Sequence, residues 1–103
     1  MTERLSRRTT RFRRTVIPGT LESGAVNIHY FQLLITVCLI RKKNVSDALE
    51  DVLVRGFSRR EACECNGISQ STLSVRLRHL QMVSHTVVRM YPYIKEQISD
   101  IEQ

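Results

Sequence analysis

Two helices and the turn between them can be read from residues 58–80, SRREACECNGISQSTLSVRLRHL. Ser58 and Glu61 form a capping box, in which the serine hydroxyl and the glutamate carboxylate each accept a hydrogen bond from the other residue's amide. This box predicts a short helix over about residues 59–65. Gly67 supplies the left-handed backbone that a sharp turn needs, and Ser69 is placed to cap a further helix over about residues 70–83.

The apolar residues of this stretch predict how the two helices cross. Leu73, Leu77 and Leu80 recur at helical spacing and form one stripe. Ala62 and Cys63 are small, so the first helix can approach that stripe closely. A short capped helix, a turn with glycine and a second capped helix are typical of a DNA-binding helix-turn-helix.

The remaining residues of the pair supply candidate DNA contacts. Glutamine can pair with adenine, arginine with guanine, serine with a phosphate or a base edge, and valine with a thymine methyl group. Cations at the start of the first helix are placed to hold phosphates. The candidate DNA-binding residues of this region are Arg59, Arg60, Ser69, Gln70, Ser71, Ser74, Val75, Arg76 and Arg78.

Three further helical stretches surround this pair. The first runs over about residues 24–41 with Ser23 as its cap, and the second over about residues 45–55, capped by Asn44 and ended by Gly56. The third covers about residues 86–100, where Pro92 either starts a new helix or kinks this one. We therefore predict an all-α domain of four to five helices, containing a helix-turn-helix, over residues 17–103.

Self-association is expected because the helix over residues 24–41 is apolar on nearly all its faces. In so small a domain, a helix of this kind is either central to the core or shared with another subunit. The candidate oligomerisation residues are Tyr30, Phe31, Leu34 and Cys63. The stretch over residues 86–100 is either a packing helix that closes the core or a second self-association surface.

The positive charge is concentrated at the start of the chain. The net charge is +6, and six arginines against one glutamate lie within residues 1–14. Such a block is either a solubilising tail or an arm that binds a polyanion by releasing counterions. We predict a basic arm over residues 1–16 that contacts DNA through Arg7, Arg8, Arg11, Arg13 and Arg14.

Composition excludes several other classes. The 103 residues suit one domain, and the three cysteines cannot form a closed set of disulfides, which favours a reducing cytoplasm. The most apolar stretch, residues 28–40, is too short to span a membrane. Cys63 and Cys65 do not have metal-finger spacing, and completing a zinc site with His79 and His85 is disfavoured. We expect no enzyme, cofactor, metal or small-molecule ligand.

Several short motifs, in order over roughly residues 17–94, resemble the PapB/FocB family of regulators of fimbrial operons in enteric bacteria. These are Pro18-Gly19, residues 28–35 (IHYFQLLI), Ala48-Leu49, residues 53–56 (LVRG), residues 58–64 (SRREACE), Ser74, Leu77, Leu80 and residues 91–93 (YPY). The segment over residues 66–72 differs from better-known members, so the target sequence does not transfer.

This resemblance implies a transcriptional regulator that binds AT-rich double-stranded DNA near a fimbrial promoter as an oligomer. It assigns Arg59 to DNA contact and Cys63 to the fold or to self-association, and it leaves open a share of minor-groove contact, which an arginine-rich arm could make. Two other functions remain as alternatives: a helical protein-interaction adaptor, and an RNA-binding regulator that uses the arm.

Overall fold

The computed structural model describes residues 17–102, and the side chains of residues 17–98. Within that range the chain forms four helices and no strand: α2 (Ile28–Val37), α3 (Lys43–Leu53), α4 (Arg59–Asn66) and α5 (Gln70–Glu102). The predicted all-α class with four to five helices is confirmed. The predicted basic arm over residues 1–16 lies outside the described residues. None of the helices in the described range is long and apolar enough to cross a membrane.

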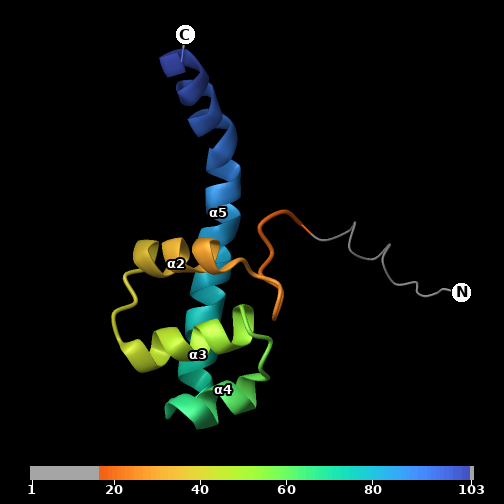
Figure 1. The fold of residues 1–103 in the computed structure, drawn as a ribbon, viewed down its shortest axis with the longest axis vertical. Helices are drawn as coiled ribbons and strands as arrows, with labels where there is room; N and C mark the ends of the chain where they lie inside the picture. Colours follow the sequence, from red (N-terminus) through yellow and green to blue (C-terminus); the bar gives the residue numbers. More distant parts are fainter. Residues whose placement is uncertain (1–16, 103) are drawn as a thin grey trace, which may run out of the picture.

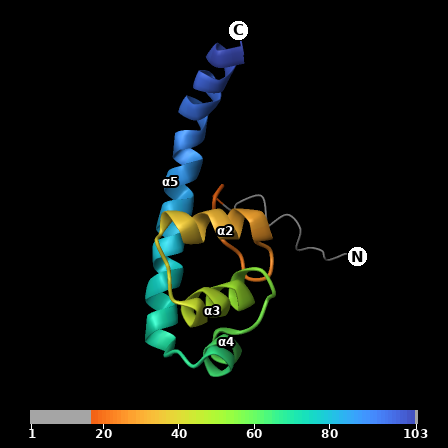
Figure 2. The same cartoon turned by 60° about the vertical axis from the view of Figure 1, so that its left-hand side comes forward.

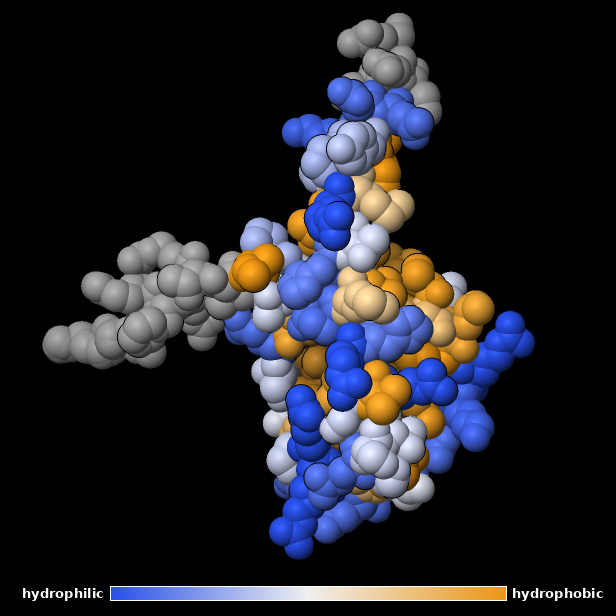
Figure 3. Space-filling view, turned by 180° about the vertical axis from the view of Figure 1, so that it is seen from behind, coloured by the Kyte–Doolittle hydropathy of each residue, from blue (hydrophilic) through white to orange (hydrophobic). Residues whose placement is uncertain are grey.

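The helices are arranged around α5. Helices α2, α3 and α4 lie one below another along its N-terminal half, and its C-terminal half projects beyond them (Figures 1 and 2). The side chains of residues 89–98 are all exposed. Hydrophobic side chains are visible on the surface where α5 leaves the bundle (Figure 3). One helix therefore has a packed half and a free half.

One hydrophobic core joins the four helices. Burying a large apolar side chain contributes about 1.5–3 kcal/mol, so this set supplies most of the driving force for folding. Its fully or nearly fully buried members are Phe31, Leu34, Val45, Ala48, Leu49, Val52, Leu53, Ala62, Cys63, Leu73, Leu77 and Leu80. The predicted leucine stripe of residues 73, 77 and 80 is thus confirmed as the face of α5 that enters the core.

The first helix begins later than the sequence predicts. Its N-cap is Asn27, whose side chain accepts hydrogen bonds from the amides of His29 and Tyr30. Ser23, the predicted cap, instead donates a hydrogen bond to the carbonyl of Val52 at 3.0 Å. The prediction was wrong because the segment before Asn27 turns at residues 23–24 and makes hydrogen bonds to the end of α3, a contact between residues far apart in the chain.

Gly24 lies at the closest point of that contact. Its amide donates to the Val52 carbonyl at 3.0 Å, and the next hydrogen bond runs from Val26 to Leu53. A Cβ atom on Gly24 would lie 3.1 Å from the Cα of Gly56, and the φ angle of +74° also disfavours a side chain. Glycine is therefore required here by both the backbone conformation and the close approach.

Helix α2 also ends, and helix α3 begins, at other residues than the sequence predicts. Helix α2 ends at Val37 rather than at residue 41, because Leu39 adopts a left-handed φ of 57° that reverses the chain. Helix α3 begins at Lys43, and its N-cap is Lys42, which makes no side-chain cap hydrogen bond. The predicted cap, Asn44, accepts a hydrogen bond from the Val45 amide inside the first turn.

The two C-terminal stretches predicted as separate form one continuous helix. Helix α5 runs from Gln70 through Pro92 to Glu102, so the prediction of two separate helices over residues 70–83 and 86–100 was wrong, and of the two alternatives given for Pro92, the start of a new helix is ruled out. No glycine or proline stands between residues 83 and 86 to end the helix. Pro92 lacks only one helical hydrogen bond on an exposed part of α5, which accommodates it within the helix.

Candidate nucleic-acid interface

The capping box fixes the start of α4. The Ser58 hydroxyl accepts from the Glu61 amide at 3.1 Å, and the Glu61 carboxylate accepts from the Ser58 amide at 3.0 Å. These bonds satisfy two amides that the helix leaves unpaired, and they place Arg59 and Arg60 in its first turn with exposed side chains. The predicted capping box is confirmed.

The turn between α4 and α5 uses the left-handed backbone that was predicted for Gly67. Gly67 has a φ of 67°, and the amides of Gly67 and Ile68 both donate to the carbonyl of Cys63, at 2.8 and 3.2 Å. The Ser69 hydroxyl then accepts from the amide of Thr72 at 3.1 Å. We call Arg59–Asn66, this turn and the first turns of Gln70–Glu102 the α4–turn–α5 unit.

The packing of this unit orients α5. Ala62 and Cys63 of α4 are buried against the same core that takes Leu73 and Leu77 of α5. Asn66 at the end of α4 donates to the carboxylate of Asp51, a buried residue of α3, at 2.9 Å, which ties the two helices together. With one face of α5 held inward, the opposite face is left to the surface.

That outer face carries most of the predicted DNA-binding residues. Ser74 is half-buried, while the others of this unit have exposed side chains, Val75 to 54%. The structure brings to this surface Arg59, Arg60, Ser69, Gln70, Ser71, Ser74, Val75 and Arg78, whereas the exposed Arg76 lies on the flank of α5 that faces the connection between α2 and α3. The predicted arm contacts Arg7, Arg8, Arg11, Arg13 and Arg14 lie outside the described residues.

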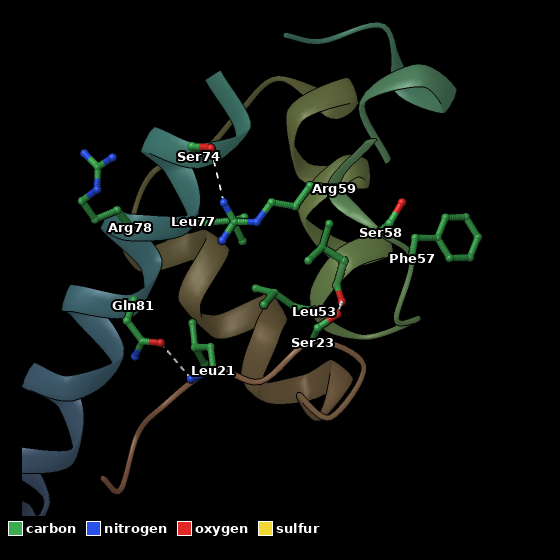
Figure 4. Close-up of a pocket in the computed structure, with 11 residues that line it drawn as sticks. Leu21, Ser23, Leu53, Phe57, Ser58, Arg59, Ser74, Leu77, Arg78 and Gln81 are labelled. Carbon is green, nitrogen blue, oxygen red and sulfur yellow. Dashed lines mark hydrogen bonds between the residues drawn. The ribbon is translucent and has the colours of Figure 1, made fainter. Parts of the chain in front are cut away.

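A groove runs between the start of α4 and α5 (Figure 4). It has a volume of about 660 Å³, with apolar residues such as Leu53 and Leu77 in its wall and Arg59 and Arg78 among the side chains that line it. The Arg59 guanidinium donates to the Ser74 hydroxyl at 3.4 Å, so a residue of α4 is held against α5. We call this the Arg59–Arg78 groove.

The ion pairs separate the cations of this surface. Arg60 pairs with Glu64 at 3.2 Å, and Arg55 lies 3.4 Å from Glu50. Among the ion pairs between described residues, none involves Arg59 or Arg78. The positive charges of Arg59 and Arg78 in the groove are therefore less compensated by carboxylates than that of Arg60. The sequence predicted the same role, DNA contact, for all three arginines.

The sequence did not predict a further contact that borders this groove. Residues 19–21, which we call the strap, are held against α5 by hydrogen bonds to Gln81 and Ser84. The amide of Leu21 donates to the Gln81 side chain at 2.9 Å, and Gln81 donates to the carbonyl of Gly19 at 3.0 Å. Ser84, fully buried, donates to the same carbonyl at 2.6 Å and lies 2.7 Å from the Tyr30 hydroxyl. The partners are more than 50 residues apart, so no local pattern signals this strap.

The predicted oligomerisation residues occupy the interior of the single chain. Phe31 and Leu34 are each 1% exposed, and Cys63 is 6% exposed. Tyr30 is half-buried and its hydroxyl lies against Ser84. Core packing therefore accounts for much of the apolar character of this helix, while the exposed apolar residues of α2 include Leu33 and Val37.

The cysteines are distributed over the core and the surface. Cys38 is half-buried, Cys63 is buried and Cys65 is exposed, and all three are free. Burial raises the pKa of the Cys38 thiol, and the positive charge of Arg76 partly opposes that rise. Within the described part of the chain, no three His, Cys, Asp or Glu side chains gather in a way that could hold a metal ion.

Comparison with known sequences decides the family. The profile of the PapB family, described as adhesin biosynthesis transcription regulatory protein, matches residues 2–94. The chain belongs to the PapB family. It is thus an adhesin-operon transcription regulator and not an enzyme, as the sequence motifs predicted, and membership of such a family implies DNA binding.

Individual PapB-family relatives cover most of the chain. The chain is 39% identical over 75 residues to the AFA-III adhesin operon regulatory protein of Escherichia coli, covering 73% of this chain and 74% of the relative. It is 30% identical over 97 residues to the E. coli pilus operon regulatory protein PapB itself, covering 94% of this chain and 93% of PapB. The fold is similar to the crystal structure of E. coli FocB, with a TM-score of 0.67, 33% identity, and coverage of 73% of this chain and 85% of FocB.

Proposed function

We propose that this PapB-family regulator binds AT-rich duplex DNA near an adhesin promoter through the α4–turn–α5 unit, as an oligomer. The observation that carries the proposal is the Arg59–Arg78 groove beside the exposed start of α5. Arginines that lack carboxylate partners among the described residues lie next to a polar helix face that α4 keeps turned outward. An operon regulator with this activity acts in the bacterial cytoplasm.

The two sets of residues have different roles in this proposal. Arg59 at the start of α4, with Arg60 and the arginines of residues 1–14, supplies phosphate affinity that does not depend on sequence. Gln70, Ser74 and Arg78 supply the reading of base edges, because they lie in the first turns of α5, the part of a recognition helix that contacts the bases. The hydrogen bond between Arg59 and Ser74 keeps the two sets in register.

The oligomer is proposed to form through the free half of α5. Tyr91, Ile94 and Ile98 are 60%, 43% and 49% exposed, which is unusual for a run of large apolar residues on one helix. A largely apolar groove of about 750 Å³ adjoins them, between residues 19–27 and α5. A second copy that brings its own free half to this groove would bury both surfaces.

The experiment that tests DNA binding is fluorescence anisotropy of the purified chain against an AT-rich and a GC-rich duplex of equal length, across a salt series. The proposal expects tighter binding to the AT-rich duplex, with a slope of about −0.9 in log K against log salt for each phosphate contact. A structured RNA of the same length is the control. Equal, weak binding to both duplexes, or preferential binding to the RNA, would contradict the proposal.

The experiment that tests self-association is sedimentation of the variant Ile94→Ser. The proposal expects this change to shift the chain toward monomer at a given concentration. The helix content should stay that of the wild type, because Ile94 is exposed. Leu33→Ser is the matched control, since Leu33 is an exposed apolar residue on α2. A loss of association with Leu33→Ser alone would place the interface on α2 instead.

A further inference from the structure

The strap is held to α5 by its backbone. Gln81 accepts from the Leu21 amide at 2.9 Å and donates to the Gly19 carbonyl at 3.0 Å, so one side chain makes both bonds. The Ser84 hydroxyl donates to the same carbonyl at 2.6 Å. Gly19 has no side chain to bury, and a Cβ atom there would lie 2.9 Å from the Cγ2 of Val88. These bonds therefore fix the path of the chain in addition to any contribution to stability.

A turn connects the strap to the start of the described chain. The amide and the hydroxyl of Thr20 both donate to the Ile17 carbonyl, at 3.0 and 2.6 Å. Pro18 followed by a glycine with a φ of +94° is typical of a type II turn. The Ile17 side chain is 65% exposed, so the backbone bonds of the turn hold this residue in place. The strap thus sets the point at which the basic arm leaves the fold.

This exit adjoins the Arg59–Arg78 groove. Leu21 and Gln81 are among the residues that line the groove, and Gln81 is one helical turn from Arg78 along α5. Figure 4 shows the hydrogen bond between Leu21 and Gln81 at the end of the groove away from Ser74. The strap is therefore both the root of the arm and part of the wall of the candidate DNA site.

The arginines of the arm are within reach of DNA at this site. An extended chain spans at most about 3.5 Å per residue, so Arg14 can lie up to about 10 Å from Ile17, and Arg7 up to about 35 Å. A binding segment that is tethered close to a site has a high effective concentration there. A fixed exit beside the groove would therefore favour contact between the arm and the same duplex that the groove binds.

Releasing the strap would move the root of the arm. The next fixed points along the chain are the bonds from Ser23 and Gly24 to the Val52 carbonyl, so residues 17–22 would join the tether. This lengthening alone lowers the effective concentration only about 1.6-fold, because effective concentration falls as the −3/2 power of length. A larger loss would report that the exit had lost its direction. A tail that served only solubility would show neither effect on DNA binding.

We infer that Gln81 and Ser84 are positioning residues for the basic arm. By holding the strap on α5, they direct residues 1–16 toward phosphates of the duplex beside the Arg59–Arg78 groove. This inference rests on the proposed function. It requires no contact between DNA and either positioning side chain, and it holds whichever groove of the DNA the start of α5 faces.

The test is a double-variant cycle in the full chain, measured by anisotropy with an AT-rich duplex of about 30 base pairs across the salt series. Gln81→Leu and Ser84→Ala each loosen the strap, and Ser84 is not among the residues that line the groove. Each change is made with the wild-type arm and with an arm variant in which five arginines become glutamine: Arg7, Arg8, Arg11, Arg13 and Arg14.

The inference expects an effect that depends on the arm. With the wild-type arm, Gln81→Leu and Ser84→Ala should each weaken binding about three- to tenfold at 0.1 M salt and reduce the salt slope by about 0.5–1. In the arm variant, neither change should alter affinity or slope. Gln97→Leu, at an exposed position on the free half of α5, is the matched control and should bind as the wild type does. Helix content, followed by circular dichroism, should stay that of the wild type throughout.

Four results would overturn the inference while leaving DNA binding by the α4–turn–α5 unit in place. These are equal losses with and without the arm arginines, losses of twofold or less with the wild-type arm, a loss in Gln81→Leu that Ser84→Ala does not share, and an arm variant that binds like the wild type. If the wild type does not bind the duplex, the inference and the proposed function are both overturned.

Discussion

The two halves of α5 belong to one helix but present opposite kinds of surface. In the N-terminal half, the leucines face the core and the polar and cationic residues face outward. In the C-terminal half, no other described helix covers the apolar residues, and tyrosines and isoleucines are on the surface (Figure 1). Packing, more than helix formation, therefore determines which surface each half presents: polar and cationic side chains in the packed half, and large apolar side chains in the free half.

The largest effect expected from this contrast is on stability. Leu80→Ala in the packed half should lower the free energy of unfolding by about 2–5 kcal/mol, because Leu80 is fully buried and its loss leaves a cavity. Ile98→Ala in the free half should lower the free energy of unfolding much less, at concentrations where the chain is monomeric. Urea unfolding measures both. Similar losses for the two variants would show that the free half is packed in solution.

A second effect concerns DNA recognition by the packed half. If Arg78 contacts a base edge, Arg78→Ala should weaken binding to the preferred duplex by about 1–3 kcal/mol. The difference in affinity between preferred and random DNA should also become smaller. Arg89→Ala, in the free half, is the control. Anisotropy with the two duplexes at one salt concentration makes the comparison. Unchanged affinity in Arg78→Ala would remove this residue from the interface.

A third effect concerns the strap at the junction of the two halves. Ser84→Ala removes a buried hydroxyl that lies within hydrogen-bond distance of the Gly19 carbonyl and the Tyr30 hydroxyl, and should cost about 1–2 kcal/mol of stability. Thermal unfolding measures it. Thr86→Ala is the matched control, because the exposed Thr86 hydroxyl bonds only within its own helix. If the Ser84→Ala variant is as stable as this control, the hydrogen bonds that hold the strap do not stabilise the fold.

The smallest effect is expected from the exposed ion pair between Lys43 and Asp47 at the start of α3. Asp47→Asn removes the partner of Lys43, which is exposed, so stability should change by well under 1 kcal/mol. Urea unfolding measures the change, and Glu64→Gln, which removes the exposed partner of Arg60, is the parallel variant. A loss above about 1 kcal/mol in Asp47→Asn would contradict this expectation.

The sequence predicted well those features that depend only on residues close together in the chain. The Ser58–Glu61 capping box, the left-handed Gly67 and the leucine stripe each depend on neighbours along the chain, and all three are present as predicted. The family was also predicted correctly, because its motifs are short and ordered.

What the sequence did not predict depends on residues far apart. Ser23 satisfies all local requirements of a helix cap, yet it bonds to Val52, 29 positions away. Phe31 and Leu34 lie in the core of the single chain, and no local pattern along their helix distinguishes such a core position from an interface position. The partners of Gln81 and Ser84 lie at residues 19 and 21, beyond the reach of any periodic pattern.

The most direct test of the central claim is an NMR titration of the chain with the AT-rich duplex, followed through backbone amide shifts. The account predicts that the largest shifts fall on residues 59–60 and 69–78, and that residues 86–98 change least at concentrations where the chain is monomeric. Largest shifts over residues 86–98, with none in the α4–turn–α5 unit, would contradict it.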